Sequence, residues 1–133
     1  MKKHLLVFCI LLALSLSLAG LVSVSFYKRH KTFKQLEYIA FCLKRYKEDT
    51  ALLPSVQQGL TSLYQRPVLS PIPEIWNGPY MEEKGSYVPD IDMWGNFIVY
   101  YVSGENVTLL SLGADGRKGG YFSSKDIILK IKI

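Results

Sequence analysis

The sequence predicts an α+β protein with one long N-terminal helix and a small antiparallel β structure towards the C-terminus. An uncharged apolar run, Leu5 to Phe26, leads into a segment with helical periodicity, and two strand-like segments separated by a turn follow much later. A length of 133 residues fits one domain and leaves no room for a second, large catalytic domain.

Residues 1–26 are predicted to form a short basic leader and a transmembrane helix. The run from Leu5 to Phe26 would make a helix roughly 33 Å long, enough to cross a hydrocarbon core of about 30 Å. Lys2-Lys3 precedes the run and Tyr27-Lys28-Arg29 follows it, so basic side chains mark both headgroup boundaries.

A cleaved secretory signal is the alternative interpretation of this segment. Leu5 to Leu16 would be its apolar region, and Ser17-Leu18-Ala19 would be a cleavage site before Gly20. Cleavage there would release a soluble, secreted, calcium-stabilised binding module. We favour a retained anchor, because hydrophobicity continues past Gly20 to Phe26.

The net charge of +5 is concentrated around the apolar run. From Glu48 to Ile133, seven Lys/Arg stand against ten Asp/Glu, which leaves this part at −3. Since it carries no basic stripe interleaved with aromatic residues, we expect a membrane partner and no nucleic-acid partner.

Residues 27–50 are predicted to continue the helix as an amphipathic segment, called the spine below. Apolar residues recur there at steps of three and four and are expected to face the core: Phe33, Leu36, Ile39, Ala40, Leu43 and Tyr46. The helix should end near Thr50, ahead of Pro54.

Residues 51–133 are predicted to form a globular head. Ser55 and Gln58 have the spacing of a capping box, which would open a short second helix with Leu60 and Leu63 inward. The segment from Arg66 to Pro89 contains five prolines, which disfavour regular helix or strand, so we expect an ordered loop there. Its apolar side chains should pack on the first helix: Val68, Leu69, Ile72, Trp76, Tyr80 and Tyr87.

A β-hairpin is predicted after this loop. Phe97 to Val102 and Val107 to Leu112 are its strands, and Ser103 to Asn106 is its turn.

No catalytic group is expected in the head, so the sequence predicts a protein that is not an enzyme. Both histidines, His4 and His30, flank the apolar run, which leaves the head without the usual base for a Ser or Cys nucleophile. Asp90 and Asp92 are interpreted as turn and capping residues.

The segment from Ser111 to Gly120 suggests a metal site. Four glycines surround Asp115, and Asp126 can return to the same point. Backbone carbonyls and carboxylates on an irregular loop suit Ca²⁺, which takes about six to eight oxygen ligands. The pattern is neither an EF-hand nor a phosphate-binding loop, and a plain turn is the alternative.

Four motifs in the head occur in a characteristic order. They are Leu53-Pro54-Ser55-Val56-Gln57-Gln58-Gly59-Leu60, Trp76-Asn77-Gly78-Pro79-Tyr80, Asp92-Met93-Trp94-Gly95-Asn96, and Ser111-Leu112-Gly113-Ala114-Asp115-Gly116 with Gly119-Gly120 and Asp126-Ile127. In this order and spacing they resemble the major pseudopilin family of bacterial type II secretion, general secretion pathway protein G.

The resemblance implies a pilin-like fold and a structural role. Such subunits polymerise into a short periplasmic pseudopilus that drives protein export through the outer membrane, together with other pseudopilins and inner-membrane secretion components. It also implies a single pass through the inner membrane with the head in the periplasm. The family's final loop binds calcium, and the matching positions are the carboxylates Asp115 and Asp126 with backbone oxygens near Leu112.

The sequence departs from the family's pattern at two places. Members usually carry a leader cut between Gly and Phe and a Glu at the fifth mature position, whereas here Met1 to His4 run into the apolar helix and the first acidic residue is Glu37. Cleavage after Gly20 would leave about 9 Å of apolar helix, too short for an anchor, so an atypical N-terminus is expected. Tyr121 to Lys125 stands where members often have acidic residues and glycines, which predicts weaker calcium binding.

Overall fold

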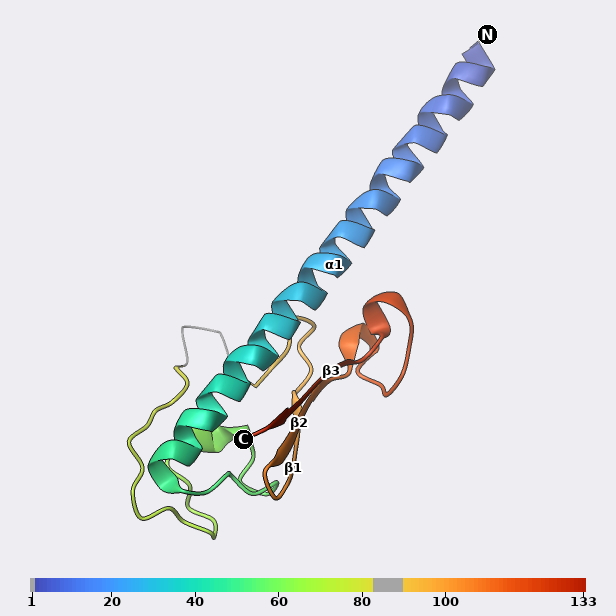
Figure 1. The fold of residues 1–133 in the computed structure, drawn as a ribbon. Coiled ribbons are helices and arrows are strands. Elements are labelled where there is room, and N and C mark those ends of the chain that lie inside the picture. Colours follow the sequence, from blue (N-terminus) through green and yellow to red (C-terminus); the bar gives the residue numbers. More distant parts are fainter. Residues whose placement is uncertain (1, 83–89) are drawn as a thin grey trace.

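The structure is a computed structural model that describes residues 2–82 and 90–133. In chain order its elements are helix α1 (Lys2–Thr50), the 3-10 helix η1 (Leu60–Leu63), strands β1 (Val99–Ser103) and β2 (Asn106–Ser111), the 3-10 helices η2 (Gly113–Asp115) and η3 (Phe122–Ser124), and strand β3 (Ile127–Lys132). One long helix lies beside a small antiparallel sheet (Figure 1), which confirms the predicted α+β arrangement.

Helix α1 runs without a break from the apolar run into the spine. Its most apolar 18-residue window has a mean hydropathy of 2.8, and none of that window is buried against the head (Figure 1). The helix ends at Thr50, as predicted, and Ala51 turns the chain away with a φ of 58°. Its 49 residues give a length of about 74 Å.

The core-facing stripe of α1 starts differently from the prediction. Leu36, Ile39, Leu43 and Tyr46 are buried as expected, but Phe33 is 37% exposed. The buried positions 32, 36, 39, 43 and 46 advance in steps of four and three, and Phe33 lies about 100° around the helix from Thr32.

Two polar residues take the place expected for Phe33. Thr32 and Gln35 are both buried. The Thr32 hydroxyl accepts a hydrogen bond from the Met93 amide at 3.4 Å, and the Gln35 side chain donates to the carbonyl of Ile91 at 2.7 Å. The upper spine is therefore joined to the head by hydrogen bonds to the backbone of residues 91–93.

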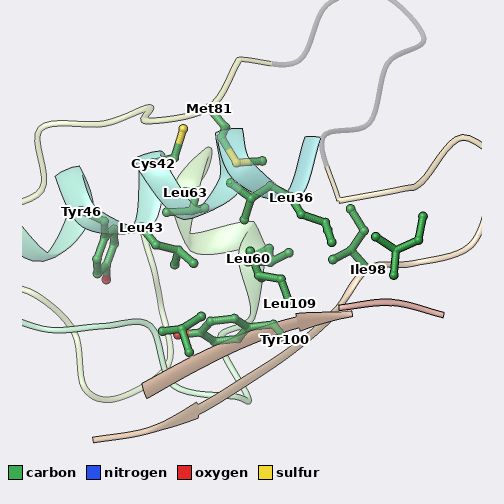
Figure 2. Close-up of a cluster of buried hydrophobic side chains, with 13 residues drawn as sticks. Leu36, Cys42, Leu43, Tyr46, Leu60, Leu63, Met81, Ile98, Tyr100 and Leu109 are labelled. Carbon is green, nitrogen blue, oxygen red and sulfur yellow. The ribbon is translucent and has the colours of Figure 1, made fainter. Parts of the chain in front are cut away.

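The core lies between the lower spine, η1 and the inner face of the sheet. Figure 2 shows Leu36, Leu43 and Tyr46 of α1 pointing toward Leu60, Tyr100 and Leu109, and these side chains are all buried. Cys42 closes one side of this cluster, where its thiol donates to the carbonyl of Tyr80 at 3.1 Å. Burial raises the pKa of the Cys42 thiol.

The sheet has the order β1-β2-β3, and both pairings are antiparallel. Its first two strands confirm the predicted hairpin, with the turn shortened to Gly104-Glu105. Strand β3 lacked a specific prediction and pairs along the whole of β2, from Asn106 opposite Lys132 to Ser111 opposite Ile127. Lys47 secures its end by donating to the carbonyl of Ile133 at 2.7 Å.

The capping box forms, but it closes a turn rather than a second α-helix. Ser55 N–H donates to the Gln58 side chain at 2.8 Å, and Gln58 N–H donates to the Ser55 hydroxyl at 3.2 Å. Gly59 then takes a φ of 62°, and the chain continues as the short 3-10 helix η1. Leu60 and Leu63 point inward as predicted.

The proline-rich loop packs on α1 through only part of the predicted set. Trp76 and Tyr80 contact the core, and the Tyr80 hydroxyl donates to Asp49 at 2.9 Å. The prediction is wrong for Val68, Leu69 and Ile72, which are all more than half exposed. The reason is that the Gln58 side chain binds the carbonyls of Leu69 and Pro71 and fixes this stretch by its backbone. Tyr87 lies outside the described residues.

Candidate functional site

The candidate metal loop connects β2 to β3 and folds back along α1. It leaves the sheet at Leu112, passes through η2 and η3, and returns at Asp126 (Figure 1). Two reciprocal hydrogen bonds close it: Asp126 N–H donates to the carbonyl of Gly119 at 3.1 Å, and Gly119 N–H donates to Oδ2 of Asp126 at 3.0 Å.

Gly113 and Gly120 allow two parts of the loop backbone to approach each other closely. A Cβ on Gly113 would lie 2.8 Å from the carbonyl oxygens of Ser123 and Ser124, and one on Gly120 would lie 2.5 Å from that of Ser124. Both glycines also have positive φ values, 67° and 80°. The carbonyl oxygens of Ser123 and Ser124 thus lie so close to these two positions that a larger residue would clash with them.

The three predicted calcium ligands belong to this loop and differ in burial and in hydrogen bonding. Asp126 Oδ1 is buried, and it has no hydrogen-bond partner within residues 2–82 and 90–133. Asp115 is exposed, and its Oδ1 accepts the Arg117 N–H at 3.1 Å. Leu112 is half-buried immediately before η2.

The donor chemistry fits a hard cation bound mainly by backbone oxygens. Among the described residues, no three His, Cys, Asp or Glu side chains gather closely enough to hold a metal. The candidate side-chain ligands are the two carboxylates of Asp115 and Asp126, so backbone carbonyl oxygens would have to complete the coordination shell of a bound cation. Oxygen-only ligation on a loop of loose geometry matches calcium rather than zinc.

Arg29 is a contributor to this region that the sequence did not reveal. Its guanidinium donates to the carbonyls of Phe122, at 3.1 Å, and Lys125, and it thereby ties η3 to α1. Its place at the end of the apolar run predicted only a headgroup role. Hydrogen bonds from one side chain to backbone carbonyls more than ninety residues away produce no recognisable pattern in the sequence.

The buried carboxylate of Asp92 holds the start of the loop through hydrogen bonds. Oδ1 of Asp92 accepts the N–H groups of Trp94 and Asn96, both at 2.9 Å, and Oδ2 accepts the Ser111 hydroxyl at 2.6 Å. Asn96 in turn donates to the carbonyl of Gly113 at 2.7 Å. Asp92 is thus a turn residue as interpreted, and it also fuses two of the four motifs into one hydrogen-bonded unit.

Comparison of the sequence with known proteins identifies a family. The model of the family described as type II secretion system (T2SS), protein G, matches residues 23–130. The type II secretion system core protein G of Pseudomonas aeruginosa is 38% identical over 96 residues, which are 69% of this chain and 63% of that protein. The corresponding protein of Vibrio cholerae is 34% identical over 89 residues, 64% of this chain and 56% of that one. The chain therefore spans about three fifths of the length of these curated relatives.

A solved structure has the same fold. The crystal structure of the major pseudopilin from the type 2 secretion system of enterohaemorrhagic Escherichia coli superposes with a TM-score of 0.65 at 23% identity. The match covers 80% of this chain and 89% of that one.

Proposed function

This chain belongs to the family of type II secretion system protein G, and on that premise we propose that it is a structural subunit of a pseudopilus. In this proposal α1 anchors the subunit in the inner membrane, the head lies in the periplasm, and repeated copies form a filament that drives export through the outer membrane. One observation supports this proposal above the others: residues 23–130 match the family, and their head is attached to an unbroken helix whose apolar N-terminal half is not covered by the head. The family match favours this role over a released binding module.

The spine offers a surface for neighbouring copies. Phe33, Tyr38 and Phe41 are 37%, 44% and 57% exposed; Phe41 lies opposite the buried stripe of the helix, and the other two lie on either flank of that exposed side. Covering large apolar side chains gains about 25 cal/mol per Å² removed from water. Association through this aromatic face and through the uncovered anchor would stack heads along a common axis, with other pseudopilins and inner-membrane components as further partners.

A photo-crosslinking residue at Phe41 tests the filament. In cells that contain the secretion machinery, we expect a ladder of dimers and higher multimers, and the same residue at Tyr101 on β1 serves as a matched exposed aromatic control. A ladder from Phe41 and a weaker one from Tyr101 would assign the contact to the spine. Strictly monomeric product from both positions would contradict the proposal.

We also propose that the C-terminal loop binds Ca²⁺ through Asp115, Asp126 and the carbonyl of Leu112. The buried Oδ1 of Asp126, which has no partner among the described residues, supports it, and the carbonyl oxygens of Ser123 and Ser124 lie close by in the same loop. When bound, the ion would supply the positive charge that lets these oxygens approach one another. The carbonyls of Phe122 and Lys125 are not counted as ligands, because Arg29 already donates to both.

A further inference from the structure

A groove separates the end of the apolar run from the C-terminal loop. It has a volume of about 470 Å³. Leu21, Val22 and Phe26 of α1 line one side, Phe122 and Lys125 line the other, and Arg29 closes it. The head therefore reaches down beside the last turns of the predicted anchor, as the loop's position in Figure 1 shows.

The loop presents its apolar side chains outward at this level. Tyr121 is 85% exposed and Phe122 is 91% exposed. Both are large aromatic side chains, and exposure of their apolar surface to water is unfavourable. Phe122 also has a φ of 50°, a backbone conformation that non-glycine residues rarely adopt. The chain thus holds an aromatic ring out of its own core, beside a helix segment that is itself uncovered.

Basic groups surround the same groove. The guanidinium of Arg29 is hydrogen-bonded to two uncharged carbonyls, so its positive charge is retained. Lys125 also lines the groove, and it is exposed. Aromatic rings beside Arg and Lys are typical of the boundary between lipid tails and headgroups.

We propose that the loop from Tyr121 to Lys125 is a second membrane contact that binds anionic phospholipid at the surface of the bilayer that α1 crosses. An acyl chain would lie along Val22, Phe26 and Phe122, with its phosphate beside Arg29 and Lys125. Lipid is the fitting occupant because one wall of the groove is continuous with the apolar span and the opening is basic. This proposal rests on insertion of α1 in a membrane, which is part of the proposed function.

Fluorescence quenching by brominated phospholipid tests the contact in the full-length chain. Phe122→Trp places an indole in the groove, and Val68→Trp is the matched control, since Val68 is a similarly exposed apolar residue (84%) of the distant proline-rich loop. Trp76 and Trp94 give both variants the same background. In dilute vesicles of phosphatidylcholine and phosphatidylglycerol, we expect a quenching constant at least about twofold larger for Phe122→Trp than for Val68→Trp, because its ring lies at tail level.

The remaining measurements separate the outcomes. Removing phosphatidylglycerol, or changing Lys125 to Gln, should reduce the quenching of the Phe122→Trp chain, whereas Lys130→Gln on β3 should not. Equal quenching of the two tryptophan variants overturns the proposal. A blue shift that grows with protein density and without lipid quenching assigns the groove to a second copy and also overturns it. Release of the chain from vesicles by alkaline carbonate would instead refute the anchor, and with it the proposed function.

Discussion

The phenolic hydroxyl of Tyr100 on β1 donates a hydrogen bond to the carbonyl oxygen of Pro54 at 2.8 Å. Tyr100 is only 6% exposed and Pro54 is fully buried, so water cannot replace the bond. This contact joins the edge strand β1 to the first residues beyond α1, and it fixes the end of the spine relative to the head.

Tyr100→Phe should lower the free energy of unfolding by about 1–2 kcal/mol, because the carbonyl of Pro54 is left buried without a donor. Urea denaturation of the detergent-solubilised chain measures this change. Tyr101→Phe is the control, since its ring is exposed on the same strand. Equal losses from the two changes would contradict the role of the Pro54 bond.

Stability should fall at alkaline pH. Burial, reinforced by the neighbouring Tyr46 phenol, raises the pKa of Tyr100, and burial is also the main cause of the raised pKa values of Tyr46 and Tyr80. The folded state holds these protons more tightly than the unfolded state. Their contribution is therefore complete below about pH 10, the ordinary tyrosine pKa, and is lost as pH rises through the folded values.

Urea midpoints measured at about pH 8 and pH 11 test this dependence, because the two values bracket the ordinary tyrosine pKa. Tyr100→Phe should show a smaller drop between them than the unchanged chain, and Tyr101→Phe should show the full drop. A midpoint that stays constant or rises with pH would show that the buried phenols do not govern stability there.

Asp92→Ala should destabilise the head by about 2–4 kcal/mol, because it removes the acceptor of three hydrogen bonds inside the fold. Ser111→Ala removes one of the three and should cost about 1–2 kcal/mol. Glu74→Ala changes an exposed carboxylate and serves as the control. Thermal melting ranks the variants, and an Asp92→Ala midpoint equal to that of the control would refute the supporting role.

Arg29→Gln should loosen η3 without unfolding the head. Losing about 1.4 kcal/mol of local stabilisation corresponds to roughly tenfold faster amide exchange in the residues that the guanidinium holds. Hydrogen–deuterium exchange across Phe122–Lys125 provides the measurement. Lys31→Gln is the basic control, since the Lys31 ammonium lies over Tyr27 instead of the loop. Unchanged amide exchange in the Arg29 variant would show that the loop keeps its structure without the hydrogen bonds of Arg29.

Millimolar Ca²⁺ should raise the melting temperature of the solubilised chain. A ligand present at about a hundred times its dissociation constant stabilises the folded state by about 2.7 kcal/mol. Asp126→Asn should abolish the rise, whereas Glu74→Gln should preserve it. Identical melting curves in calcium and in chelator would remove the calcium proposal, and an equal rise with Mg²⁺ would show that the site does not select the larger ion.

Helical period predicted the long helix, the strand-like segments predicted the hairpin, and the capping spacing predicted the contacts between Ser55 and Gln58 but wrongly a second α-helix after them. Each of these contacts is encoded within a few neighbouring residues. Thr32 and Gln35 were missed at the top of the stripe, since polar residues are buried there to bind the backbone of the head. The regular alternation of Ile127, Leu129 and Ile131 could have identified β3.

The position of the candidate loop between two extended segments was predictable, whereas Asp115 and Asp126 as its calcium ligands stay a prediction. Its closure by Asp126 and Gly119 joins near neighbours and follows from glycine-rich sequence. The contacts of Arg29 and the exposure of Phe122 did not follow, because they depend on how the loop docks on a helix that lies more than ninety residues earlier. The exposed Val68 shows the opposite error, in which apolar character alone suggested burial.

The continuity of α1 has a mechanical consequence. No proline interrupts Lys2–Thr50, and Gly20 is its single glycine, so the helix contains no joint between the bilayer and the core. The hydrogen bond at Thr32 and the packing down to Tyr46 hold the head against about four turns of this helix. If α1 anchors the subunit as proposed, a thrust applied to the anchor would reach the head as a nearly equal displacement, because the helix between them has no flexible break.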